Sequence, residues 1–250
     1  MHRGAGAGAE ALDGRGVRLG APVSVIALLI RIPVRVIGLI MGFGAGVLIS
    51  AVAFDLVEEA AAKSTGHGAL VAGIFAGCLV FFGGDRLIDR LGGGDRKDPT
   101  GAEEEGGGSP LSIVLGTVLD GIPESMVIGL TIFEGGAVGA AYLAAVFISN
   151  LPESISSTSG LVTSGWVKSR ILWMWIGITL VSALASLAGY GLFQDSSPGV
   201  VAFVLTFAAG AILTMLANTM MPEAFEHGGK WVGIMVTLGF AVAFTIHLLD

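Results

Sequence analysis

The chain has 250 residues, of which 53% are hydrophobic and 13% are charged, with a formal net charge of −7. A soluble domain carries about 25% charged residues, so this composition, with a mean hydropathy of +0.83, predicts a membrane protein. The negative charge argues against nucleic acid as a partner, because nucleic-acid binding needs a basic face. The single cysteine, Cys78, excludes an intramolecular disulfide and a thiolate metal cluster.

Apolar segments of membrane-spanning length follow one another along the chain, since runs of about 18 apolar residues predict transmembrane helices. The predicted fold class is all-α: a polytopic membrane protein whose eight transmembrane helices form one bundle over residues 1–250. The predicted spans are 17–31, 34–57, 68–88, 110–133, 136–159, 170–193, 198–221 and 231–249. Residues 1–16 are a poorly defined N-terminal segment, and 92–109 form an acidic, Gly-rich loop. The 40 glycines suit close approach of helices in lipid.

The basic residues predict the orientation of these spans. The connections 1–2, 3–4, 5–6 and 7–8 hold Arg31, Arg35, Arg86, Arg90, Arg96, Lys97, Lys168, Arg170 and Lys230, whereas the opposite connections hold Lys63 alone. Cytoplasmic loops carry an excess of Lys and Arg. We therefore expect a multi-pass protein of the plasma (inner) membrane, with the 92–109 loop in the cytoplasm and both termini on the extracytoplasmic side.

Two related motifs lie near the middle of spans 4 and 5: residues 120–125 (DGIPES) and 149–154 (SNLPES). Carboxylates at that depth are costly, and they face a bundle interior or a water-filled path. Pro123 and Pro152 each remove one backbone N–H and leave the carbonyl four residues earlier without its usual partner. The pattern predicts proline-kinked helices 4 and 5 at the centre of the bundle.

The two motifs together form a candidate metal site. Residues four apart share a helix face, so Asp120 lies over Glu124, and Ser149 lies over Glu153. Two antiparallel helices would bring a set of oxygen ligands towards one point: Asp120, Glu124, Ser149, Asn150 and Glu153. An all-oxygen site of this kind suits a divalent cation. Three carboxylates around one dication leave a surplus negative charge that protonation relieves.

Further polar residues lie at the two ends of the predicted spans. Asp55, Glu58 and Glu59 end span 2 on the outer side, either as ordinary boundary charges or as a cation-attracting entrance. A third Pro-Glu pair closes span 7, where Glu223 and His227 are either a solvated helix end or an exit site. Asp85 is interpreted as an ion pair with Arg86, and His247 as a surface or packing residue.

On these residues the chain resembles the ZIP (Zrt/Irt-like) family of divalent metal transporters. The resemblance covers about residues 30–250 and rests on the 35–59 stretch, the Pro-Glu pairs of spans 4 and 5, the hydrophilic 3–4 loop and Met221-Pro222-Glu223. It implies eight spans, a binuclear metal centre between helices 4 and 5, uptake towards the cytoplasm and often a homodimer. An elevator-like movement has been proposed for the family.

The resemblance also implies roles for individual residues. Glu124 and Glu153 fall on the bridging carboxylates, Asp120 and Ser149 on the first site, and Gly121 and Asn150 on the second. Asn218 and Thr219 stand where some members have His and Glu. Asp in place of His makes the ligand set harder, which favours Mn²⁺ somewhat, although Zn²⁺ and Fe²⁺ also accept carboxylates. Gly121 has no side-chain ligand, so one well-formed site is expected.

The function expected from the sequence is transport of zinc, iron or manganese across the bilayer, without a cofactor and without enzymatic activity. Two alternatives stay open. A membrane enzyme could use the paired carboxylates as acid and base, but the chain lacks a recognisable nucleophile motif such as Gly-x-Ser-x-Gly. A non-transporting metal-binding scaffold is the other, and the missing ligand at Gly121 favours it.

Overall fold

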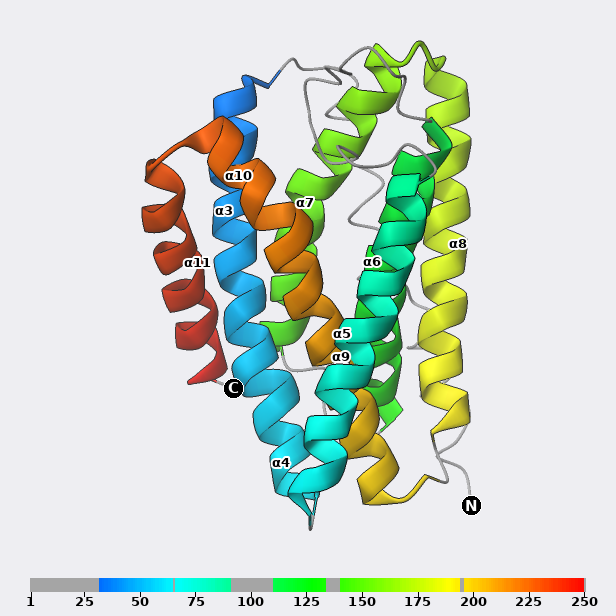
Figure 1. Ribbon diagram of the computed structural model, residues 1–250, viewed down its shortest axis with the longest axis vertical. Coiled ribbons are helices and arrows are strands. Elements are labelled where there is room, and N and C mark those ends of the chain that lie inside the picture. The colour runs from blue at the N-terminus through cyan, green and yellow to red at the C-terminus, as the bar shows by residue number, and fades with distance from the viewer. Residues whose placement is uncertain (1–31, 65, 91–109, 134–139, 194–195, 250) are drawn as a thin grey trace.

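The computed structural model describes residues 32–64, 66–90, 110–133, 140–193 and 196–249 (Figure 1). All regular structure within these ranges is helical, which confirms the predicted all-α class for this part of the chain. The elements are α3 (Val34–Ala51), η1 (Val52–Glu58), α4 (Glu59–Lys63), α5 (His67–Arg90), α6 (Pro110–Phe133), α7 (Ala140–Thr163), α8 (Lys168–Leu192), α9 (Pro198–Met215), η2 (Leu216–Met220), α10 (Met221–Gly228) and α11 (Trp231–His247). The predicted span 17–31, the segment 1–16 and the loop 92–109 lie outside the described residues.

Five helices in the described ranges are long and apolar enough to cross a membrane. They are Val34–Lys63, His67–Arg90, Ile113–Leu130, Lys168–Gly191 and Pro198–Gly228. Trp231–His247 is apolar but shorter. These helices support a membrane protein, and the total of eight spans stays a prediction.

The five helices divide into central and peripheral ones. In the apolar windows of Val34–Lys63 and Pro198–Gly228, 67% and 61% of the residues are buried, compared with 17% for His67–Arg90 and 11% for Lys168–Gly191. The peripheral helices turn large apolar side chains outward, among them Phe75 and Leu79 on α5 and Trp173 and Leu184 on α8. Outward apolar faces of this kind suit contact with lipid.

Reciprocal glycines hold three pairs of helices together. Across each interface, a Cβ added to either glycine would overlap a backbone carbonyl oxygen of the partner helix. The pairs are Gly46 and Gly239 between α3 and α11, Gly77 and Gly210 between α5 and α9, and Gly129 and Gly189 between α6 and α8. Without side chains, the helix backbones approach closely enough for dispersion forces to act where lipid removes the hydrophobic drive. This confirms the packing role expected of the glycines.

The irregular turns of the bundle lie in the two central helices. η1 and η2 are π-helical and continue directly from α3 and α9, which extends these helices beyond the predicted ends at 57 and 221. Pro222 does not end the second one, because it falls in the first turn of α10, where a missing N–H is tolerated. In contrast, α6 continues as an α-helix through Pro123. Insertions of this π type are frequent at functional sites.

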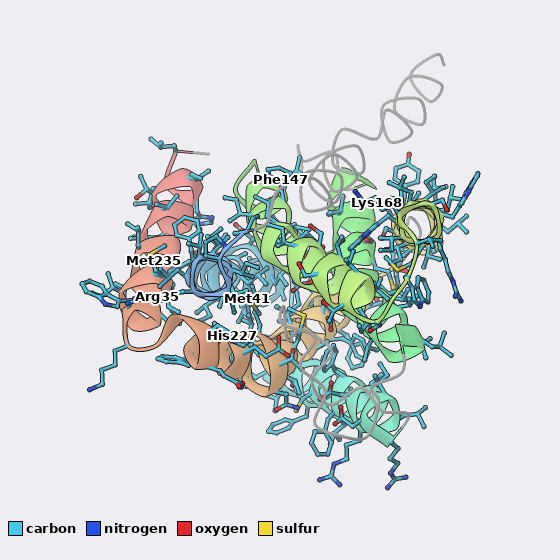
Figure 2. All side chains as sticks on the ribbon, turned by 90° about the horizontal axis from the view of Figure 1, so that it is seen from above. Arg35, Met41, Phe147, Lys168, His227 and Met235 are labelled. Carbon is cyan, nitrogen blue, oxygen red and sulfur yellow. The ribbon has the colours of Figure 1, made fainter. Side chains whose placement is uncertain are left out.

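The basic residues gather at one end of the bundle. Arg35 begins α3, Arg86 and Arg90 end α5, Lys168 and Arg170 begin α8, and Lys230 precedes α11. These element ends lie together at the top of Figure 1, and Lys63 lies at the opposite end. Seen from that end in Figure 2, α3 lies between α11, α10 and α7, in agreement with the packing of these elements.

Candidate metal site

α7 is a polar helix that lies among apolar ones. Its sequence holds Ser149, Asn150, Glu153 and a run of hydroxyl residues that ends at Thr163. It packs against α3, α6, α8 and α11. A helix of this composition gains little from facing lipid, so its polar residues are satisfied inside the bundle. Ser149, Ser157 and Thr158 are accordingly at most 3% exposed.

Two hydrogen bonds fix how α6 and α7 face each other. Asn150 Nδ2 donates to Glu124 Oε2 at 3.0 Å. The hydroxyls of Thr117 and Ser157 lie 3.2 Å apart. Each contact is seven residues from the other on both helices, in opposite directions, so the two helices are antiparallel and the contacts lie along one seam. The motif residues Glu124 and Asn150 therefore meet directly.

Two residues on each helix flank this seam between the two contacts: Asp120 and Gly121 on α6, and Glu153 and Ser154 on α7. A Cβ on Gly121 would lie 3.7 Å from Ser182 Oγ of α8. Gly121 therefore faces α8. This orientation explains why a side-chain ligand at position 121 would not point along the seam towards α7.

A contact with α8 also shows which side of the seam each flanking residue of α7 occupies. Thr158, one turn after Ser154, accepts a hydrogen bond of 3.0 Å from Trp175 Nε1 of α8. Ser154 therefore lies on the α8 side. At about 100° per residue, Asp120 and Glu153 fall on the opposite flank, away from α8. The three motif carboxylates occupy the seam and one side of it.

That side of the seam meets α3 and η2. A Cβ on Gly44 of α3 would lie 3.2 Å from Ser149 Cα, 3.7 Å from the Ile148 carbonyl oxygen and 3.0 Å from Met220 Cε. Gly44 thus lets α3 approach α7 at the first residue of its motif. It also brings the end of η2 to the same place.

The motif carboxylates are buried. Glu124 is 2% exposed, Asp120 3% and Glu153 4%. Burial of carboxylates away from water is costly unless hydrogen bonds or an opposite charge compensate them. Asn150 supplies one such bond and also donates to the Val146 carbonyl oxygen at 2.7 Å. Within the described ranges, no three His, Cys, Asp or Glu side chains are arranged so as to hold an ion.

The predicted entrance residues fall at the end of the bundle opposite the basic residues. Asp55 Oδ1 lies 2.9 Å from His247 Nδ1, and this joins η1 to the end of α11. Glu59 pairs with Lys63 at 3.5 Å, and Glu58 is exposed. The interpretation of His247 as a packing or surface residue missed this contact, since 192 positions separate it from Asp55.

The predicted exit residues divide between buried and exposed positions. Glu223 is 9% exposed, so it is not the solvated helix end that the sequence allowed. Asn218, an exposed residue of η2, donates to Asp85 Oδ2 of α5 at 3.4 Å. His227 lies against Gly38 of α3, where an added Cβ would be 2.9 Å from His227 Cβ.

Asp85 is a polar residue that the sequence analysis undervalued. It is 5% exposed, whereas Arg86 is exposed and its guanidinium lies 4.8 Å from the centre of the Phe82 ring. A Cβ on the preceding Gly84 would lie 3.2 Å from Leu119, the residue before Asp120. Asp85 and Asn218 thus lie at the Asp120 level of α6. The available signal was an acidic residue inside the predicted span 68–88.

The comparisons with known proteins do not add a family to this description. No family model matches the chain, and no curated protein matches it.

Proposed function

We propose that this chain carries a divalent metal cation, such as zinc, iron or manganese, across a membrane and into the cytoplasm. The cation would bind between α6 and α7 to oxygen atoms of Asp120, Glu124, Ser149, Asn150 and Glu153. The observation that carries the proposal is that the motifs 120–125 and 149–154 meet at the Asn150–Glu124 hydrogen bond. Asp120 and Glu153 are buried on one flank of the same seam.

Charge balance supports a cation as the substrate. With all three carboxylates ionised, the buried set would carry a charge of −3, which one dication reduces to −1. Hard oxygen donors suit Mn²⁺ and Mg²⁺ and are also accepted by Zn²⁺. Asn150 Nδ2 donates to Glu124, so the neutral amide oxygen of Asn150 is available as a ligand.

Polar residues on other helices support a path that leads to the site. Asp55 lies between the site and the end of the bundle in η1, and Asp85 and Asn218 lie at the level of Asp120. Both π-helical turns carry one of these residues. In a π turn the hydrogen-bond ladder shifts, which is tolerated at membrane depth where protein or water surrounds the backbone. The basic residues gather at the end of the bundle where α3 begins, which supports a cytoplasmic position for that end.

Uptake into proteoliposomes tests the proposal. The purified protein, Glu124→Gln and Glu153→Gln are reconstituted, and the entry of zinc or manganese is followed with an enclosed indicator dye. We expect uptake by the unchanged protein and at least a tenfold loss in each variant, while helical content by circular dichroism stays the same. Normal uptake by both variants would show that Glu124 and Glu153 do not bind the transported cation. Metal binding without uptake would instead favour a scaffold.

A competition series tests the ligand set. Zn²⁺, Mn²⁺, Fe²⁺ and Cd²⁺ are offered to the same vesicles, each against a fixed amount of labelled substrate. The oxygen donors predict that Mn²⁺ and Fe²⁺ compete at least as well as Cd²⁺, because cadmium favours softer ligands. Strong selectivity for Cd²⁺ would contradict a site made of oxygen atoms alone.

A further inference from the structure

Tyr142 of α7 carries a buried hydroxyl that packing does not explain. The residue is 2% exposed and is among the largest fully buried side chains. Its phenolic oxygen has no hydrogen-bond partner among the described residues. Buried tyrosine hydroxyls usually find a partner, and a phenylalanine would fill the same space without leaving a polar atom unsatisfied. The hydroxyl is therefore a candidate ligand inside the bundle.

The position of Tyr142 follows from the contact between Gly44 and Ser149. α3 and α7 run in opposite directions (Figure 1). Tyr142 precedes Ser149 by seven residues, and Asp55 follows Gly44 by eleven. At 1.5 Å per residue these steps are about 10 Å and about 16 Å in the same direction. The backbone of Tyr142 thus lies between the level of the carboxylate site and the level of Asp55.

The electrostatic surroundings agree with this placement. The Tyr142 hydroxyl lies within electrostatic range of the carboxylates of both Glu124 and Asp55. Glu124 belongs to the seam, and Asp55 contacts His247 at the end of the bundle.

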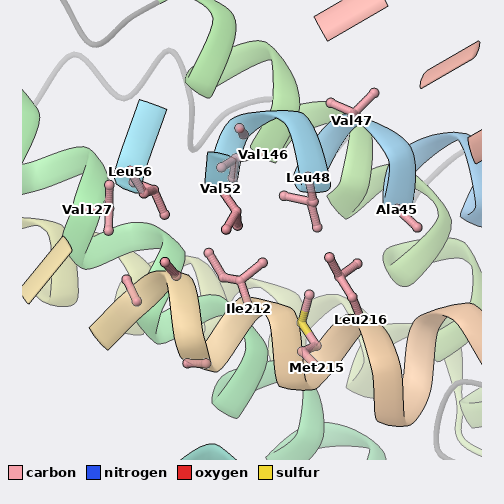
Figure 3. Packing of buried hydrophobic residues seen from close by; sticks show 14 of the residues in the cluster. Ala45, Val47, Leu48, Val52, Leu56, Val127, Val146, Ile212, Met215 and Leu216 are labelled. Atoms are coloured by element: carbon pink, nitrogen blue, oxygen red, sulfur yellow. The ribbon is translucent and has the colours of Figure 1, made fainter. Parts of the chain in front are cut away.

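Tyr142 packs in a layer of apolar side chains. It belongs to a hydrophobic cluster in which Val52 and Leu56 of η1 face Val127, Val146 and Ile212 (Figure 3). A cation that left Asp55 for Glu124 would cross this layer, and losing its water there without a replacement ligand is costly.

We propose that Tyr142 closes the outer part of the ion path and that its hydroxyl is a passing ligand for the cation between Asp55 and Glu124. This inference rests on the proposed transport function. The aromatic ring fills the layer and blocks water, while the phenolic oxygen offers a hard and neutral donor. A neutral donor lets the cation pass without adding a further negative charge to hold it back.

Transport kinetics provide the first test, with the other tyrosine of the chain as a matched control. Tyr142→Phe removes only the oxygen, and Tyr190→Phe makes the same change on α8. We expect Tyr142→Phe to lower the initial rate of zinc uptake about tenfold, while equilibrium zinc binding in detergent stays within twofold. Tyr190→Phe should leave both unchanged. A wild-type rate in Tyr142→Phe would overturn the proposal, whereas the transport function would stand.

Fluorine NMR provides a second test that does not require transport. The chain contains two tyrosines, so incorporation of 3-fluorotyrosine gives two resonances, which Tyr190→Phe assigns. Zinc should shift the Tyr142 resonance and leave that of Tyr190 in place, and Glu124→Gln should remove the shift. An unmoved Tyr142 resonance at saturating zinc would overturn the inference. A shift in a protein that fails to transport would instead contradict only the proposed function.

Discussion

The side-chain amide of Asn150 donates to the Glu124 carboxylate at 3.0 Å, across the seam between α6 and α7. The two residues come from motifs that the sequence places in consecutive spans, and their contact sets the register of both helices. Because the same nitrogen also bonds the Val146 carbonyl oxygen, the amide is held by its own helix as well. The amide oxygen remains the atom that can face a cation.

Replacing Asn150 tests the support that it gives to Glu124. Asn150→Leu removes the donor, and a buried carboxylate that loses a hydrogen bond destabilises the fold by about 1.5–3 kcal/mol. We expect a lower melting temperature in detergent. Added zinc should widen the difference, because the variant also lacks one of the proposed ligands and is stabilised less by the cation. Equal melting temperatures of Asn150→Leu and the unchanged protein without metal would show that this hydrogen bond does not stabilise the fold.

Acid should weaken metal binding. Carboxylates must be deprotonated to act as ligands, so protons and cations compete for Asp120, Glu124 and Glu153. The apparent Kd for zinc should rise on the acid side, by up to about tenfold per pH unit for each proton displaced. Isothermal titration at several pH values measures both the affinity and the protons released. Zinc binding as tight at pH 3.5 as at pH 6 would not fit a site of three carboxylates, because carboxyl groups ordinarily titrate near pH 4.

The close approach of α3 to α7 at Gly44 predicts a steric effect on the site. An added Cβ there lies 3.2 Å from Ser149 Cα, so Gly44→Val must displace one of the helices. Overpacking of this kind typically costs 1–3 kcal/mol, and we expect both the melting temperature and the zinc affinity to fall. Gly177→Val on α8 is the control, because a Cβ at that glycine meets nothing within 4 Å. Equal effects of the two substitutions would refute a local cause.

Asp55 should act on the arrival of the cation rather than on its final binding. Asp55→Asn removes a charge beside His247, and we expect a higher KM for uptake with a similar maximal rate. Glu226→Gln is the control, because Glu226 is an exposed residue of α10 outside the predicted entrance. A lower maximal rate with an unchanged KM would assign Asp55 to a later step.

Local sequence pattern predicted much of the helical framework and the facing motifs. The four-residue spacing of Asp120 and Glu124, and of Ser149 and Glu153, places each pair on one helix face, and the structure keeps both segments helical. The predicted span 34–57 was too short because Glu58 and Glu59 resembled a helix end, yet the helix continues through η1 and α4 to Lys63.

Contacts between distant helices could not be predicted in this way. Asp55 meets His247, and Asp85 meets Asn218 across 133 positions, and no local spacing relates either pair. Gly121 was judged by its missing side chain, whereas its direction towards Ser182 depends on where α8 packs. Nothing in the sequence indicated a role for the Tyr142 hydroxyl, because the proposed role depends on its position relative to Glu124 and Asp55 on other helices.

The most direct test of the central claim is the anomalous scattering of manganese in crystals of the protein grown with this ion. The account predicts one strong peak between α6 and α7, with oxygen atoms of Glu124 and Glu153 both at coordination distance, and loss of the peak in Glu124→Gln. A manganese peak elsewhere in the bundle, with these two carboxylates not bound to it, would contradict the account.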